Sequence, residues 1–385
     1  MHTIDFVRRR KQRWILIAFF FLSGMITASW SSRIPDIQHK LALDNRSLGN
    51  VLFAVPAGLV LGLLLASRLV GRYGTKRIMR TGCVILALAL LLTAFTSGSL
   101  QLMMALFLLG MSRTIFNLSI NTTAVDLQKQ YDEPIMSRFH GIWSAACLAA
   151  AGIGTFMIIQ GVKPFVHFAG IAIVAVVLSL LLISRQGKQA PPEEKGPLVI
   201  KPDRYLFLLG LIALCAMLCE SAMFDWSVNY FDKVVKADKA FITVGYTCFI
   251  AAMTLGRLFG DRLIAAFGIY RMLTVNAISM AAGLLLAALL PQLLPASIGF
   301  MLIGFGDSML VPMIYLLASQ SKKMTSNYAL QAVTLVGYGG FLIGPLFVGN
   351  VSQLWGMNYA FLLLSGVSLF ILVLTGSVKR LAVTA

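Results

Sequence analysis

Apolar residues fill this chain in runs of about 20, and short polar or basic stretches separate the runs. A helix of about 20 residues crosses the roughly 30 Å hydrocarbon core of a membrane, because each residue adds about 1.5 Å. The pattern therefore predicts an all-α integral membrane protein with twelve transmembrane helices. The predicted spans are residues 14–34, 46–68, 78–97, 100–125, 138–160, 163–184, 204–230, 241–264, 272–290, 294–319, 327–350 and 355–378.

One stretch of the pattern occurs twice. Residues 62–77, GLLLASRLVGRYGTKR, have a near copy at residues 256–271, GRLFGDRLIAAFGIYR, which lies 194 positions further on. Two glycines, two arginines and a leucine recur at this offset, and an aromatic residue, Tyr73 or Phe267, precedes the second glycine of each copy. Because 194 is about half of the 385 residues, we interpret the chain as a duplication.

Only one connection between spans is long. It covers residues 185–203 and contains QGKQAPPEEKGP, whose Pro, Gly and mixed charges are typical of a flexible linker. We therefore predict an N-terminal six-helix bundle at residues 1–184, a cytoplasmic linker, and a C-terminal six-helix bundle at residues 204–385. An even number of spans gives both halves the same orientation, as in parallel repeats about an axis along the membrane normal.

The distribution of charge predicts the orientation of the chain in the membrane and limits the kinds of partner that we expect. Only 12% of the residues are charged, and the net charge of +17 comes from basic residues in short loops. By our count, 24 Lys and Arg lie on the side of the N-terminus and 7 on the other. This bias predicts that both termini are cytoplasmic. Basic residues that flank membrane spans do not indicate a nucleic-acid partner, so we expect membrane lipid and a small-molecule solute as partners of a monomer.

Twelve spans, two parallel halves, a basic linker and the Gly-x-basic turn after spans 2 and 8 resemble the major facilitator superfamily. The Asp-Trp-Ser of span 7, the Gly-Arg-x3-Asp-Arg-Leu of span 8 and the Trp-Ser of span 5 resemble its fucose-permease-like bacterial branch. The resemblance implies alternating access in a bacterial inner membrane. The chain departs from the family pattern at Ser67, where an acid is usual, and keeps that acid only in the second copy, as Asp261.

A polar stripe marks span 4. Arg113, Asn117 and Asn121 recur at every fourth residue and therefore share one helix face. We expect this face to line a central cavity and to bind substrate, although hydrogen bonds between helices would also account for it. The offset of 194 aligns Arg113 with Asp307. Either the two pair directly as a gate, or Arg113 binds an anionic or polyhydroxylated solute while Asp307 exchanges a proton.

Three carboxyl groups lie inside predicted spans and more than one turn from the span ends, namely Glu220 and Asp225 in span 7 and Asp307 in span 10. An ionisable group at bilayer depth costs roughly 3 kcal/mol or more unless it faces a cavity or a partner. All three are therefore candidates for proton coupling. Glu220 and Asp225 are five residues apart, about 140° around the helix, so they cannot both point at one spot.

Further polar and aromatic residues are candidates for the substrate site. His140 and Trp143 lie one turn apart on span 5, where an aromatic face could stack on a sugar ring. Gln331, Thr334 and Tyr338 form a second polar stripe on span 11, with spacings of three and four, and could complete the C-terminal wall.

The repeated basic turns are candidates for a gate. Charged side chains there can bond helix C-termini, whose partial negative charge favours cations. The residues concerned are Arg68, Arg77, Asp261, Arg262 and Arg271. A role in topology alone is the alternative.

The sequence as a whole predicts a secondary active transporter, not an enzyme, because no nucleophile–base or metal constellation occurs. We expect no cofactor and no bound metal; a proton gradient, or a sodium gradient, would supply the energy. The first hypothesis is proton-coupled uptake, by symport, of a sugar, sugar acid or organic anion. The alternative is proton-driven efflux of a metabolite or drug-like compound, which the 18 Met and 25 Phe would suit. A solute sensor that does not cycle is the third hypothesis.

Overall fold

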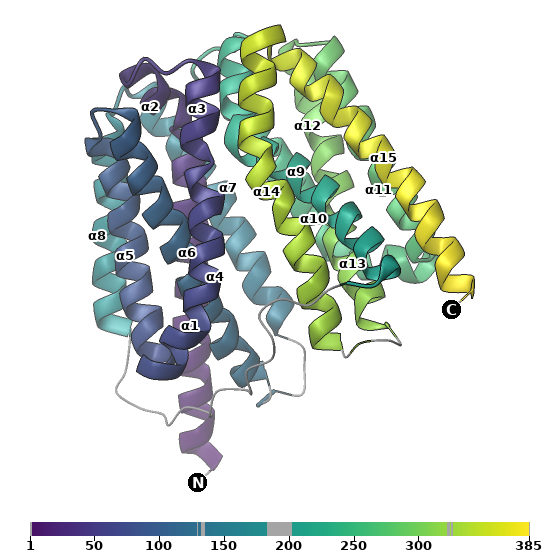
Figure 1. Cartoon of the computed structure of the whole chain (residues 1–385). Helices are drawn as coiled ribbons and strands as arrows, with labels where there is room; N and C mark the ends of the chain where they lie inside the picture. The colour runs from purple at the N-terminus through teal and green to yellow at the C-terminus, as the bar shows by residue number, and fades with distance from the viewer. Residues whose placement is uncertain are drawn as a thin grey trace. The chain divides into compact units, whose positions relative to one another are not determined.

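A computed structural model describes residues 2–128, 130–131, 135–182, 202–321, 324 and 326–384, almost all of them in α-helices (Figure 1). In this part of the chain the helices are α1 His2–Ser32, α2 Ile34–Lys40, α3 Asn45–Leu52, α4 Ala54–Tyr73, α5 Thr75–Phe95, α6 Ser99–Gln128, α7 Met136–Ile159, α8 Pro164–Leu182, α9 Arg204–Lys233, α10 Val244–Phe267, α11 Ile269–Leu289, α12 Leu293–Ser308, α13 Leu310–Ser319, α14 Ser326–Trp355 and α15 Met357–Thr384.

Eleven helical segments among the described residues are long and apolar enough to cross a membrane. They coincide with eleven of the twelve predicted spans. The remaining predicted span, residues 241–264, coincides with α10, a helix of 24 residues that carries Arg257, Asp261 and Arg262 in its second half. These charges set α10 apart from the other spans.

The chain divides into two compact units. The first contains residues 1–43 and 54–194, and the second contains residues 44–53 and 195–385. The predicted linker at 185–203 lies outside the described residues except for its last two positions. The predicted boundary at 184 differs from this division in one respect, because α3 packs within the second unit, although it precedes α4 of the first unit in sequence.

Glycine lets α3 approach α14 closely. A Cβ atom on Gly49 would lie 2.5 Å from the carbonyl oxygen of Pro345, and one on Gly349 would lie 2.8 Å from that of Asn45. Asp44 caps α3 by accepting a hydrogen bond from the Ser47 backbone N–H at 2.7 Å, which lowers the pKa of the Asp44 carboxyl group. Small residues at a helix interface therefore hold this short helix in the second unit.

Two predicted spans are broken, and each break lies four residues before a proline. A proline does not always end a helix in this chain, because α14 continues through Pro345. Proline has no N–H, so it cannot donate to the carbonyl four residues earlier. Pro56 leaves the Leu52 carbonyl without this bond, and α3 ends at Leu52. Pro312 does the same to Ser308, and α12 ends at Ser308.

The duplication is visible in the packing of each unit. In the first unit, Gly110 of α6 lies against the Val55 carbonyl of α4, so close that a Cβ atom would clash. In the second, Gly304 of α12 lies against the Phe249 carbonyl of α10 in the same way. Gly110 and Gly304 are 194 positions apart, and so are Val55 and Phe249. The repeat in the sequence is therefore also a repeat of helix contacts.

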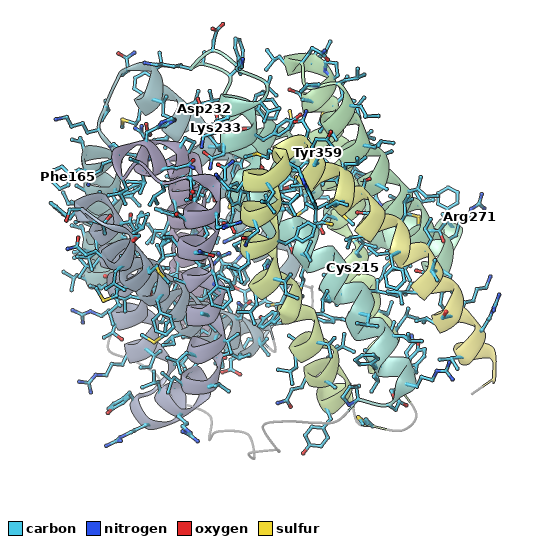
Figure 2. All side chains as sticks on the ribbon, turned by 45° about the horizontal axis from the view of Figure 1, so that its top comes forward. Phe165, Cys215, Asp232, Lys233, Arg271 and Tyr359 are labelled. Atoms are coloured by element: carbon cyan, nitrogen blue, oxygen red, sulfur yellow. The ribbon has the colours of Figure 1, made fainter. Side chains whose placement is uncertain are left out.

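The repeated turns are also alike. Gly74 and Gly268 have φ angles of 86° and 80°, which L side chains rarely adopt. Across each turn a guanidinium group lies over the preceding aromatic ring, at 5.8 Å for Arg77 over Tyr73 and 5.7 Å for Arg271 over Phe267. Arg271 projects from the surface of the second unit (Figure 2). The aromatic, glycine and arginine of the motif therefore form one turn structure.

Candidate functional site

The predicted polar stripe of span 4 lies on α6, next to α1 of the first unit. Arg113, Asn117 and Asn121 are all half-buried. Ser23 of α1 donates a hydrogen bond to Asn117 Oδ1 at 2.9 Å, and Asn121 Nδ2 donates to the Asn117 carbonyl at 2.8 Å. The stripe is therefore a hydrogen-bonded surface on one helix face, as the spacing predicts.

Arg113 differs from the buried arginine of the same unit. Arg33 is 1% exposed, and its guanidinium meets Asp36 at 2.7 Å, the Val162 carbonyl at 2.9 Å and His167 Nδ1 at 3.3 Å. Arg113 has no hydrogen-bond or ion-pair partner among the residues that the structure describes. The two arginines therefore differ: described residues hold the Arg33 guanidinium, and none of them holds that of Arg113. The predicted role of Arg113 in substrate binding stays a prediction.

The second unit contains a cluster of charged groups around Asp307, in the last turn of α12. Asp307 is 2% exposed, and neither carboxylate oxygen has a hydrogen-bond partner in the described part of the chain. The charges that act on it are those of Glu220 on α9 and Arg257 on α10. Asp225 is half-buried, and its charge is not among those that act on Asp307. Of the three predicted proton-coupling residues, Glu220 and Asp307 therefore lie within electrostatic reach of each other. The role of all three in proton coupling stays a prediction.

Arg257 joins this cluster to the helix break. Its Nε donates to the Ser308 carbonyl at 3.3 Å, and its terminal nitrogen lies 3.9 Å from a Glu220 carboxylate oxygen. Pro312 cannot donate a backbone hydrogen bond to this Ser308 carbonyl, because proline has no N–H. A freed backbone group inside a membrane needs another partner, and Arg257 supplies it.

Sequence reasoning missed Arg257, because it was counted among the basic residues of the loop after span 8. The signal was present. Arg257 directly follows the repeated Gly256, with apolar residues on either side, and the offset of 194 aligns it with Leu63. A cation that replaces a leucine within a span is a candidate functional residue.

The second polar stripe is partly connected to the same cluster. Thr334 Oγ1 on α14 lies 3.0 Å from the hydroxyl of Tyr315 on α13. Tyr315 in turn lies within electrostatic reach of Glu220 and near Tyr338. Tyr315 is a second residue that the sequence did not single out. Gln331 is exposed, whereas Thr334 and Tyr338 are half-buried.

The remaining substrate candidates lie on α7. His140 is exposed and meets the ring of Phe20 edge-on, with ring centroids 5.5 Å apart. Trp143 is half-buried, and its backbone carbonyl contacts Gly24 of α1. Their role in solute binding stays a prediction.

The predicted gate residues are all exposed at the repeated turns: Arg68, Arg77, Asp261, Arg262 and Arg271. Arg77 and Arg271 are engaged with aromatic rings of their own unit. A gate, like a direct pair between Arg113 and Asp307, would act between the two units, and both stay predictions.

Taken together, these groups are ionisable or polar side chains on membrane-spanning helices. The first unit has, on a polar stripe, a guanidinium that no described residue pairs with, and the second has two carboxyl groups and one guanidinium at a broken helix. Ionisable groups inside membrane helices and discontinuous helices mark solute pathways. Two such units of membrane-spanning helices define a multi-pass transporter.

The family model of the Major Facilitator Superfamily matches residues 14–336, and the chain belongs to this superfamily. An uncharacterized MFS-type transporter of Yersinia pestis is 29% identical over 342 residues, which are 89% of each chain. The uncharacterized transporter y4wD of Sinorhizobium fredii is 26% identical over 377 residues, 97% of this chain and 100% of that one. The protein is accordingly a membrane transporter for a small-molecule solute and not an enzyme.

Solved structures share the fold. The crystal structure of the nucleoside transporter NupG has a TM-score of 0.75 to this chain and covers 96% of it, and 99% of that chain is matched. The sequence identity is 15%, so the likeness concerns the fold. The predicted all-α membrane architecture and the predicted superfamily are confirmed.

Proposed function

We propose that the protein couples the uptake of a small anionic or polyhydroxylated solute to the entry of a proton. The observation that carries the proposal is the composition of the cluster in the second unit, where two carboxyl groups, Glu220 and Asp307, share one guanidinium, Arg257. One cation neutralises one carboxylate. The cluster is therefore neutral when it holds one proton, and neutrality is strongly favoured at bilayer depth.

Asp307 is the group that would hold the proton. A buried carboxylate without hydrogen-bond donors is unstable as an ion, whereas its protonated form carries no charge to solvate. Glu220 lies 3.9 Å from Arg257 and has a 16% exposed side chain, so it is the better placed of the two to stay ionised. Release of the proton from Asp307 would require Arg257 to turn from the Ser308 carbonyl toward the new charge.

Arg113 is the group that would hold the solute. Its planar guanidinium suits a carboxylate or a pair of hydroxyl groups, and no residue in the described part of the chain occupies it. Asn117 and Asn121 continue the same face and offer amide donors and acceptors. This stripe favours a sugar, a sugar acid or an organic anion over an apolar compound.

The energy would come from a proton gradient across a bacterial inner membrane, with both chain termini in the cytoplasm. Transport in the opposite direction, by exchange of a proton for an outgoing metabolite, would use the same cluster. The sign of proton movement separates the two, because uptake carries protons with the solute and efflux carries them against it.

Proteoliposomes that contain the purified protein and the pH dye pyranine provide the test. A panel of glucose, galacturonate, gluconate, 4-hydroxybenzoate and uridine would be added outside. We expect a sugar, sugar acid or organic anion of the panel to acidify the lumen and to exchange with its labelled form. Labelled solute that enters without proton movement would overturn the coupling, and alkalinisation of the lumen would show export. Binding without exchange would identify a sensor.

A further inference from the structure

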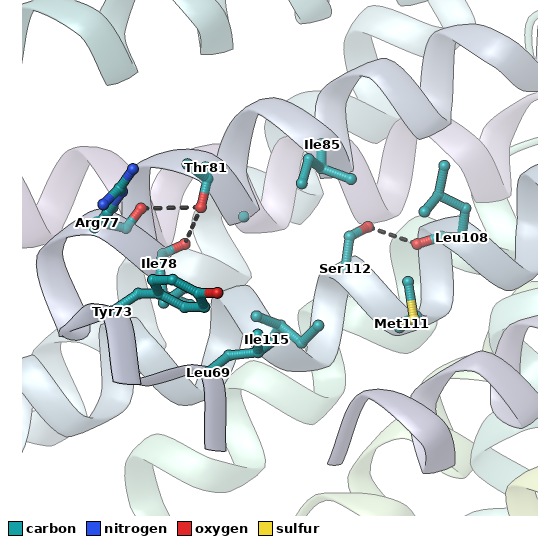
Figure 3. A pocket seen from close by; sticks show the side chains of 11 residues that line it. Leu69, Tyr73, Arg77, Ile78, Thr81, Ile85, Leu108, Met111, Ser112 and Ile115 are labelled. Carbon is teal, nitrogen blue, oxygen red and sulfur yellow. Dashed lines mark hydrogen bonds between the residues drawn. The ribbon is translucent and has the colours of Figure 1, made fainter. Parts of the chain in front are cut away.

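A groove of about 330 Å³ lies between α4, α5 and α6 of the first unit (Figure 3). Its size falls within the range of small-molecule sites, about 300–1,000 Å³. The residues that line it are Leu69, Tyr73, Arg77, Ile78, Thr81, Gly82, Ile85, Leu108, Met111, Ser112 and Ile115. The walls are mostly aliphatic, and the polar side chains of Tyr73, Arg77 and Thr81 gather at one end (Figure 3).

Arg77 is the charged group at that end. It is exposed and lies 5.8 Å from the centroid of the Tyr73 ring, which holds the guanidinium beside the groove. Among the described residues it forms no ion pair with a carboxylate. Arg77 is therefore the one charged side chain in the lining of the groove. The guanidinium of Arg72 also lies 5.3 Å from the Tyr73 ring, but Arg72 does not line the groove.

The groove adjoins a face of α5 that suits hydrocarbon. Ile85, Leu88, Leu92 and Phe95 recur at spacings of three and four residues, and 43–61% of each is exposed. All four lie within the candidate membrane span Thr75–Phe95. A stripe without polar residues at this depth indicates contact with lipid.

The second repeat does not preserve the residues that open this groove. The offset of 194 replaces Gly82 by Asn276 and Met111 by Phe305. Asn276 is fully buried, and its Nδ2 donates to the Phe305 carbonyl at 3.4 Å. A side chain with a hydrogen bond thus stands where the first repeat has a glycine, so the opening is a property of the first repeat.

We propose that this groove binds an anionic phospholipid, with one acyl chain between α4, α5 and α6 and the phosphate on Arg77. The positive charge complements the phosphate, and the aliphatic walls complement the chain. The basic turn lies on the predicted cytoplasmic side, where clusters of Lys and Arg near the membrane recognise anionic headgroups.

Native mass spectrometry of the purified full-length protein tests the site. The protein would be mixed with equal amounts of dioleoylphosphatidylglycerol and dioleoylphosphatidylcholine, and the retained lipid would be counted. We expect the phosphatidylglycerol to be retained roughly fivefold better, as a single basic contact supplies. Arg77→Gln should reduce this ratio to about one, because only the charge is lost. Arg80→Gln, an exposed arginine one turn away that does not line the groove, is the matched control.

A second set of variants tests the trough itself. Ile85→Trp fills the groove, and Met111→Phe copies the residue of the second repeat. Both should abolish retention of either lipid, whereas Leu92→Trp, on the same exposed face but outside the groove, should retain lipid like the wild type. Unchanged melting temperatures identify the variants that are folded. The proposal is overturned if Arg77→Gln keeps the preference, or if folded Ile85→Trp and Met111→Phe retain lipid like Leu92→Trp.

Discussion

The fourth span of the first repeat is one unbroken helix of 30 residues, α6, whereas its counterpart in the second repeat is two helices, α12 and α13. The difference can be traced to one aligned position, Leu118 in α6 and Pro312 in the second repeat. The proline frees the Ser308 carbonyl, and Arg257 occupies it. In the first repeat the residue aligned with Arg257 is Leu63, which has no donor to offer.

The contacts that the repeats share are those of the scaffold. Gly110 and Gly304 pack against matching carbonyls of α4 and α10, so the helix backbones approach in the same way. One turn further along each helix, Arg113 and Asp307 carry opposite charges. Duplication thus kept the packing and changed the polar groups, which gives one unit an open guanidinium and the other a carboxyl cluster at a break.

The largest change in stability is expected when a helix break like that between α12 and α13 is introduced into α6 of the first repeat. Leu118→Pro would free the Thr114 carbonyl in α6, where Leu63 stands in place of Arg257, and should lower the free energy of unfolding by about 3 kcal/mol or more. The reverse change, Pro312→Leu, should leave stability unchanged or raise it, because Ser308 regains an N–H donor. Thermal unfolding in detergent measures both. Equal losses in the two variants would contradict the assignment of Arg257 as a compensating donor.

The next effect concerns Arg113. In the solute-transport assay, Arg113→Gln should weaken binding of an anionic solute by roughly 1.5–3 kcal/mol, the range of hydrogen bonds to charged groups, or about 10–100-fold. Arg113→Lys keeps the charge but loses the planar set of donors of the guanidinium. Its affinity for the solute should therefore lie between those of the wild type and Arg113→Gln. Arg80→Gln, at an exposed position of α5 outside the predicted substrate and gate residues, is the control. A half-saturation concentration that does not change in Arg113→Gln would exclude this residue from the solute site.

The matching helix contacts of the two repeats predict a smaller loss of stability, of similar size in both repeats. Gly110→Ala and Gly304→Ala each bring a methyl group into a backbone carbonyl, at a cost of about 1–3 kcal/mol that the better helix propensity of alanine reduces by about 1 kcal/mol. Both should therefore be destabilised to a similar degree. Gly152→Ala should not be, since no atom lies within 4 Å of its Cβ position. Loss of stability in only one of the pair would show that the two helix contacts are not equivalent.

The smallest effect is expected at the turns. Tyr73→Leu and Phe267→Leu remove the aromatic faces under Arg77 and Arg271, and exposed cation–π contacts contribute about 0.5–1 kcal/mol. Phe267→Leu should lower the free energy of unfolding by that amount. Tyr73→Leu should lower it by up to about twice as much, because the guanidinium of Arg72 also lies 5.3 Å from the Tyr73 ring. A much larger loss in either variant would indicate that the turn has further partners.

Much of this architecture could be predicted from the sequence. The spacing of apolar runs located the spans, and the repeated offset aligns Gly110 with Gly304, whose helix contacts match in the structure. The stripe of Arg113, Asn117 and Asn121 also lies on one face of α6, because a period of four on a helix leaves little freedom.

The sequence pattern did not predict where two of the membrane helices end or which side chain bonds to a backbone carbonyl freed by a proline. Pro56 and Pro312 stand inside predicted spans, but whether a proline ends a membrane helix depends on which donor reaches the freed carbonyl. That donor is Arg257 for Ser308, and it lies 51 residues earlier in the chain. Tyr315 also depends on contacts that are distant in sequence. Its neighbours Glu220, Thr334 and Tyr338 come from other helices, so the sequence pattern did not single it out.

The most direct test of the account is Asp307→Asn in pyranine-loaded proteoliposomes, with the solute that acidifies the wild-type lumen. Asparagine keeps the shape of the side chain but cannot carry a proton. We predict that exchange of labelled solute continues, while accumulation driven by a pH gradient and the accompanying acidification are lost. An Asp307→Asn protein that still accumulates solute and acidifies the lumen like the wild type would contradict the assignment of the coupling site to this cluster.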